Sequence, residues 1–96
     1  MEYASLIENE YPVFLGFLKA KFPLFHNSNF FFRDLQYGAE KFLEKKGIKI
    51  RMGQAEKLAK DLASYLEGKG IFIKINNFCW RLNYPEYLTT TPGDPF

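Results

Sequence analysis

The chain is poor in the residues that build disulfide-bonded or metal-stabilised folds. Among its 96 residues there is one cysteine, Cys79, and one histidine, His26. A single cysteine forms no internal disulfide and supplies too few thiolates for a zinc finger. The composition therefore excludes a disulfide scaffold and a thiolate metal site.

Long hydrophobic runs are missing as well. No apolar stretch approaches the ~20 residues that cross a bilayer. The first residues, MEYASLIENEY, show neither the basic region nor the apolar core of a secretory signal. We therefore expect a cytoplasmic protein without a transmembrane segment.

The length and composition predict one globular domain. Hydrophobic residues make up 47% of the chain and charged residues 25%, which is typical of a folded domain with a single core. We place this domain at residues 1–88. Residues 89–96, rich in Thr, Pro and Gly, are expected to form an irregular tail.

Few residues are suited to catalysis. His26 stands beside Asn27 and Ser28 with no cysteine or carboxylate at a ligand spacing, so a capping or surface role is expected for it. The segment from Gly47 to Gly53 lacks the Gly-Lys-Ser/Thr ending of a phosphate loop. We therefore predict that the protein is not an enzyme, with no catalytic residue, metal site, cofactor or small-molecule substrate.

Charge is unevenly distributed along the chain. The net charge is +2 overall, but residues 1–40 carry −2 and residues 41–81 carry +6. A basic segment in a nearly neutral protein indicates a face that binds a polyanion, because clustered Lys and Arg release condensed counterions on binding. The alternative is a solvated lysine-rich surface.

Helical periodicity covers most of the first 70 residues. Apolar side chains recur every three or four positions from Tyr3 to Phe22, but Pro12 predicts a break near residues 10–11 and a new helix that ends at Phe22. A second helix is expected over roughly 29–46, capped by the polar side chains of residues 26–29. A third is expected over 53–67.

Two alternating runs, 71–75 and 78–82, predict a β-hairpin with an Asn76-Asn77 turn. One register puts six apolar side chains on a single face: Ile75 opposite Phe78, Ile73 opposite Trp80, and Ile71 opposite Leu82. In that register Phe72 lies on the outer face beside Cys79. The fold class is therefore α+β, three helices followed by a hairpin.

This order resembles the winged-helix superfamily, in which a helix-turn-helix precedes a C-terminal β-hairpin wing. The segment YLEGKGI (65–71) followed by Trp80-Arg81-Leu82 is similar to the end of the last helix and the wing of such domains. Met52-Gly53-Gln54 with residues 78–82 is faintly similar to the DEP subgroup, whose members bind membranes and proteins. The connection from Gly47 to Met52 is longer than in a strict helix-turn-helix.

The resemblance implies a small winged-helix DNA-binding protein, a transcriptional regulator or chromatin-type factor. The last helix would enter the major groove of double-stranded DNA, and the hairpin would contact the flanking backbone. Gln54 and Ser64 would reach base edges, although Glu56 and Asp61 on the same helix oppose phosphate binding. The implied DNA-binding residues are Lys49, Arg51, Gln54, Lys57, Lys60, Ser64, Lys69, Lys74 and Arg81.

A second hypothesis is a protein-interaction module, an adaptor or complex subunit on the same fold. Eighteen residues are aromatic, and three consecutive phenylalanines on a helix cannot all face one core. Phe30, Phe32 and Phe72 are therefore candidate interface residues for a homodimer or another protein partner. The alternatives are that the N-terminal helix or the tail covers these rings, or that the protein associates with anionic membranes.

Overall fold

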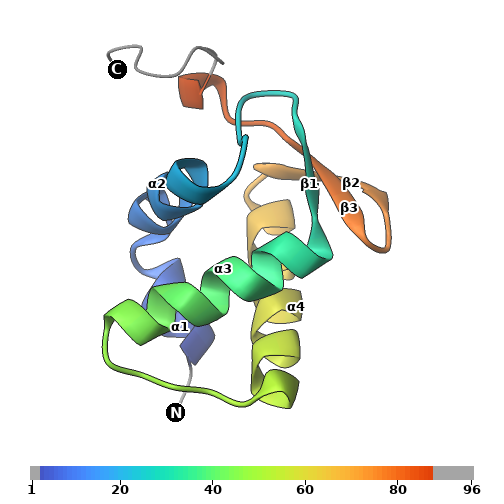
Figure 1. The fold of residues 1–96 in the computed structure, drawn as a ribbon. Helices are drawn as coiled ribbons and strands as arrows, with labels where there is room; N and C mark the ends of the chain where they lie inside the picture. Colours follow the sequence, from blue (N-terminus) through green and yellow to red (C-terminus); the bar gives the residue numbers. More distant parts are fainter. Residues whose placement is uncertain (1–2, 88–96) are drawn as a thin grey trace.

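Helices occupy the first two thirds of the molecule, and a β-hairpin follows them. The computed structural model describes residues 3–87; the tail predicted for 89–96 lies outside this range. The described part is α+β, with four α-helices, a three-stranded antiparallel sheet and a final 3-10 turn (Figure 1). In chain order the elements are α1 (Tyr3–Glu8), α2 (Tyr11–Lys21), β1 (Asn29–Phe31), α3 (Phe32–Lys45), α4 (Met52–Gly68), β2 (Phe72–Asn76), β3 (Cys79–Leu82) and the 3-10 turn Pro85–Tyr87.

The helices at the two ends of the helical region follow the sequence prediction. α2 carries Pro12 in its first turn and ends at Lys21, so the break after α1 is confirmed. α4 extends one residue beyond the predicted 53–67 at each end. It stops at Gly68, and Gly70 then adopts a φ of 76°, a conformation that side-chain-bearing residues rarely adopt. This turn lets the Ile71 N–H donate to the Leu66 carbonyl and leads directly into β2.

The predicted helix over 29–46 is wrong at its start. Residues 29–31 form β1, and α3 begins only at Phe32. The polar run does not cap α3, because Phe31 stands at the cap position without a side-chain bond. Instead the Ser28 hydroxyl accepts a hydrogen bond from the Phe25 N–H at 3.0 Å. The extended conformation of β1 is stabilised by its pairing with β3, in which Phe30 lies opposite Trp80.

The hairpin forms, but the predicted register is wrong by one residue. Phe72 lies opposite Leu82 and Lys74 opposite Trp80, and an irregularity between Lys74 and Asn76 shifts the turn to residues 77–78. Asn76 shapes this turn through its side chain, whose Oδ1 accepts the Phe78 N–H at 2.8 Å. As a result Phe72 faces the core, whereas Ile73, Ile75 and Phe78 are exposed.

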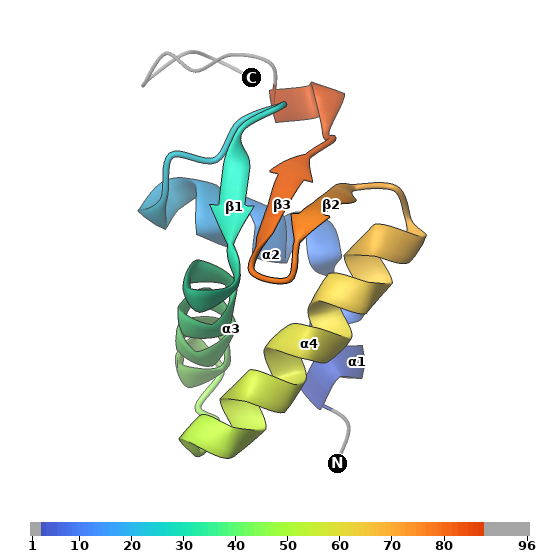
Figure 2. The same cartoon turned by 90° about the vertical axis from the view of Figure 1, so that its right-hand side faces the viewer.

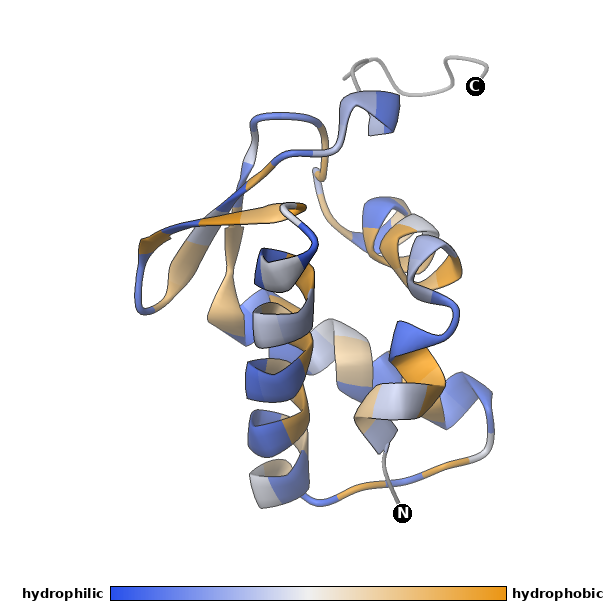
Figure 3. Ribbon diagram, turned by 180° about the vertical axis from the view of Figure 1, so that it is seen from behind, coloured by the Kyte–Doolittle hydropathy of each residue, from blue (hydrophilic) through white to orange (hydrophobic). Residues whose placement is uncertain are grey.

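The core lies between α1, α2, α3 and α4 and the inner face of the sheet, which covers the helices at one end (Figure 2). Figure 3 shows hydrophilic residues on the outward side of α4 and hydrophobic ones towards the other helices. The sheet order is β1-β3-β2, so β3 is the central strand. No helix within residues 3–87 has both the length and the apolar character needed to cross a bilayer.

Candidate interaction surface

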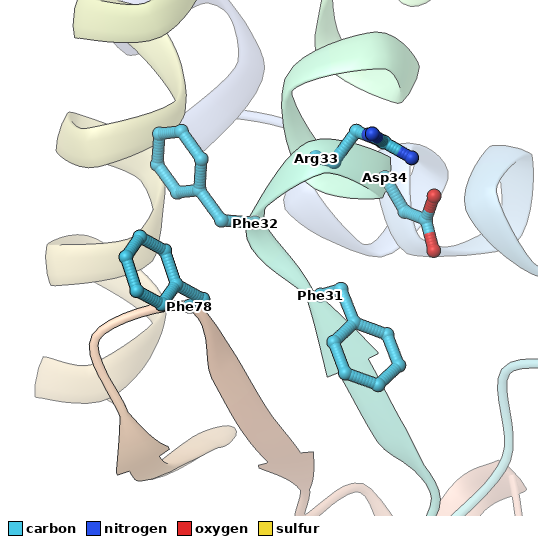
Figure 4. Close-up of a pocket in the computed structure, with 5 residues that line it drawn as sticks. All are labelled: Phe31, Phe32, Arg33, Asp34 and Phe78. Carbon is cyan, nitrogen blue, oxygen red and sulfur yellow. The ribbon is translucent and has the colours of Figure 1, made fainter.

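Three phenylalanines line one hollow where the hairpin turn approaches the start of α3. Phe31 ends β1, Phe32 begins α3, and Phe78 occupies the turn between β2 and β3; we call these three residues the aromatic tip. Figure 4 shows the rings of Phe32 and Phe78 on one side of the β1–α3 junction and the ring of Phe31 on the other. The tip is thus assembled from segments nearly fifty positions apart in the sequence.

Hydrogen bonds hold the backbone of the aromatic tip. The Phe32 N–H donates to the Phe78 carbonyl at 2.8 Å, and the Phe78 N–H is bound by the Asn76 side chain. The Phe32 ring packs near the Trp80 indole, with centroids 6.2 Å apart. Both the backbone N–H and the carbonyl of Phe78 are therefore hydrogen-bonded, and its ring projects from this ordered backbone.

The aromatic tip is exposed although it is apolar. Phe78 is 71% exposed and Phe31 50% exposed. Ile75 and Ile73 are also exposed on the neighbouring strand β2. Burying one such side chain stabilises a protein by about 1.5–3 kcal/mol, so a group of them held in water by an ordered backbone indicates a contact surface.

Two hollows flank the aromatic tip and share Phe32 and Phe78 as walls. The first has a volume of about 390 Å³ and is completed by Phe31, Arg33 and Asp34. The second, which we call the α4 groove, has a volume of about 530 Å³ and runs between α4 and the hairpin. Its lining comprises Phe32, Glu56, Lys60, Ala63, Ser64, Glu67, Lys74, Asn77, Phe78 and Trp80.

The α4 groove combines aromatic walls with charges of both signs. The Trp80 Nε1–H donates to Glu67 Oε2 at 2.6 Å, and Lys60 Nζ lies 3.5 Å from Glu56 Oε2. Both carboxylates on the α4 side are thus engaged. Lys74 is exposed on β2, and none of the ion pairs formed within residues 3–87 involves it.

Three side chains of the predicted DNA-contacting face of α4 are exposed and make contacts within or next to that helix. Lys57 Nζ lies 3.0 Å from Asp61 Oδ2, and Lys60 is paired with Glu56. Gln54, predicted to reach a base edge, accepts the Arg51 N–H with its Oε1 at 2.9 Å and so caps α4. Of this set, Lys60, Ser64 and Lys74 are brought together, along the α4 groove.

The remaining predicted DNA-binding residues point to other parts of the surface. Arg81 donates to Asn27 Oδ1 at 2.6 Å across the outer face of the sheet. The Lys69 ammonium lies 5.2 and 5.3 Å from the ring centroids of Tyr11 and Tyr65. Lys49 and Arg51 are exposed before α4. The +6 segment therefore does not form one continuous basic face.

The predicted interface residues need correction. Phe30 is 3% exposed and Phe72 is 2% exposed, and their rings pack together with centroids 6.1 Å apart. Both rings belong to the core, because β1 and the shifted hairpin register turn them inward. Phe32 is half-buried and lies in the aromatic tip. Sequence reasoning missed Phe78 because a register slip of one residue exchanges the two faces of a strand. It missed Phe31 because residues 29–31 were expected to be helical and instead form β1.

His26 is hydrogen-bonded to Tyr84 and Tyr87 near the end of the described residues. His26 Nδ1 accepts the Tyr84 N–H at 3.0 Å, and the His26 N–H donates to the Tyr87 carbonyl. Burial raises the pKa of Tyr84 and raises that of Tyr87 to about 12. Over residues 3–87, no three His, Cys, Asp or Glu side chains gather where they could hold a metal ion.

Comparison with known proteins assigns no family to this chain. No family model, no curated protein and no solved structure matches it. The geometry of the aromatic tip and the α4 groove is therefore the basis for a functional proposal.

Proposed function

We propose that this protein is a protein-interaction module that binds its partner through the aromatic tip and the α4 groove. The observation that carries the proposal is the Phe78 ring, 71% exposed on a turn pinned by hydrogen bonds. Rigid aromatic anchors beside pockets are typical of binding hot spots, because little conformational entropy is lost when they become buried. The two hollows that flank the ring supply the pockets.

A winged-helix relationship is part of this proposal. The order α2, α3, α4 and then the β2–β3 hairpin agrees with the arrangement that the sequence suggested. In this interpretation the wing serves as a docking element for protein. Asp61 and Glu56, which lie beside Lys57 and Lys60 on α4, favour this use over the reading of DNA, because their negative charge opposes the approach of phosphates.

Site-specific photo-crosslinking tests the proposal. A photoreactive benzoylphenylalanine at position 78 should give a discrete adduct in a lysate of the source cells. The matched control is the same residue at Val13, which is also exposed but lies on α2, an element that lines neither hollow. Adducts of equal yield at both positions, or none at position 78, would contradict the proposal. An adduct with a second copy of the chain would identify a homodimer.

Double-stranded DNA is the second candidate ligand, and one observation favours it: Lys60, Ser64 and Lys74 line a single groove. Fluorescence anisotropy of a labelled mixed-sequence duplex titrated with the protein should then show an affinity that falls ~10-fold or more when the salt is raised from about 50 to about 200 mM. Lys60→Glu with Lys74→Glu should abolish it, and the matched control is Lys21→Glu with Lys45→Glu, two exposed lysines that do not line the groove. Absence of binding at the lower salt rejects this candidate.

A further inference from the structure

We propose that the partner segment is an extended acidic peptide that adds as a fourth strand to the free edge of β2, with one apolar side chain in the α4 groove and a carboxylate beside Lys74. This inference rests on the proposed function, because it names the partner of the same surface. It follows from the backbone of β2, from the shape of the groove and from its charges.

The backbone of β2 has a free edge. In the order β1-β3-β2, the central strand β3 is paired on both sides, and within residues 3–87 no strand pairs with the outer side of β2. The Asn83 N–H donates to the Ile71 carbonyl at 2.7 Å, so in the alternation of an antiparallel pair Ile71 and Ile73 direct their backbone groups to β3. Phe72 and Lys74 then direct theirs outward, where an added strand can bond them.

The free edge borders the α4 groove. Figure 2 shows β2 between β3 and α4, and Lys74 of β2 lines the groove. The α4 wall from Glu56 to Glu67 is ~16 Å long at the helical rise of about 1.5 Å per residue. That length corresponds to about five residues of an extended strand, so a short segment fills the groove.

The groove walls select the side chains of that segment. Alternate residues of an added strand point to the same face, which here is the face of Phe72 and Lys74. Towards the tip this face meets the rings of Phe32 and Phe78 with Trp80 beneath them, a setting for a large apolar side chain. Two residues away, a carboxylate would pair with Lys74.

Charge also argues against a second copy as the added strand. Two β2 edges paired antiparallel about a two-fold axis would bring Lys74 of both copies close together, and like charges on neighbouring strands are destabilising. A lysine on an edge strand protects it from such self-pairing. The same lysine attracts an acidic segment, because no carboxylate within residues 3–87 forms an ion pair with it.

A designed peptide tests the inference directly. The probe is the capped hexapeptide Thr-Asp-Val-Phe-Val-Thr, in which Asp and Phe lie on one face of a strand. Its binding is followed by the fluorescence of Trp80, the single tryptophan, and by NMR shifts of the β2 amides. We expect saturable binding with a dissociation constant below about 1 mM. Lys74→Glu should raise this dissociation constant at least ~10-fold, which corresponds to the loss of one charge contact.

Three controls make the result decisive. Lys49→Glu carries the same charge change away from the groove and should bind as the parent does. A peptide with Lys in place of Asp should bind Lys74→Glu better than it binds the parent. A peptide N-methylated at its first Val and at Phe should lose binding, because strand addition needs the backbone N–H groups of the peptide.

The outcomes separate this inference from the proposed function. A crosslink at position 78 without peptide binding overturns the acidic strand and leaves the interaction module standing. Peptide binding that is insensitive to N-methylation and to Lys74→Glu also overturns strand addition. If neither a crosslink at position 78 nor peptide binding is observed, both the interaction module and the acidic strand are overturned.

Discussion

The indole nitrogen of Trp80 donates a hydrogen bond to the carboxylate of Glu67 at 2.6 Å. This contact ties the central strand β3 to the last turn of α4. It places a buried aromatic ring and a charged acceptor side by side at the bottom of the α4 groove.

Glu67→Ala should lower the free energy of unfolding by about 1–2 kcal/mol, because it leaves the Trp80 N–H without its acceptor. Glu67→Gln keeps an oxygen at the same position and should cost less. Urea unfolding followed by Trp80 fluorescence measures both. Equal stability of Glu67→Ala and the parent would show that the hydrogen bond contributes nothing net.

Truncation to alanine should lower stability strongly at Phe72 and hardly at all at Phe78. Phe72→Ala removes a core ring and should cost about 3–5 kcal/mol, a large part of the stability of a domain this size. Phe78→Ala removes an exposed ring and should change stability by less than about 0.5 kcal/mol. Thermal denaturation of the two variants tests the hairpin register, since the register predicted from the sequence gives the reverse order.

Gly38 lies where α3 crosses α2, and a Cβ there would meet the Leu18 side chain. Leu18 is fully buried, so its displaced methyl group has no free space. Gly38→Ala should therefore destabilise the protein by about 1–3 kcal/mol. Gly53→Ala in α4 meets no atom within 4 Å and should gain up to about 0.5 kcal/mol from helix propensity. A stabilised Gly38→Ala would contradict the close contact of the two helices.

Tyr87 should make the protein sensitive to alkali. Burial raises its pKa from 10.0 to about 12, so the unfolded chain loses this proton at lower pH than the folded one. Stability from this group is complete below pH 10 and is lost as the pH rises from 10 to about 12. Melting temperatures measured across this range should fall less steeply for Tyr87→Phe. The same substitution at the half-exposed Tyr37 is the control, and identical slopes for the Tyr87 variant and the parent would contradict the prediction.

The helices could be predicted because their signals are local. Pro12 marks the start of α2, and apolar spacing delimits α4 to within one residue. β1 could not be found in this way, since a three-residue strand depends on pairing with Trp80 and its neighbours fifty positions later. The α+β class was predicted correctly, whereas the winged-helix relationship, the function and the localisation stay predictions.

The prediction of the hairpin register was wrong for a different physical reason. The sequence predicted the register that puts six apolar side chains of residues 71–82 on one face, and this pattern does not reveal an irregularity within a strand. In the structure the strand bends between Lys74 and Asn76, so that the larger rings of Phe72 and Trp80 are buried together. The candidate site was missed with it, because Ile75 and Phe78 were assigned to the core.

The position of β3 in the middle of the sheet also dictates how the molecule assembles. α3 with α4, and β2 with β3, join neighbours in sequence and close short loops, which form rapidly. β1 must instead pair with β3 across about fifty positions, as between Phe30 and Trp80, at a greater entropic cost of loop closure. Until that pairing forms, β3 presents an unpaired edge, and such an edge is a template for association with other chains.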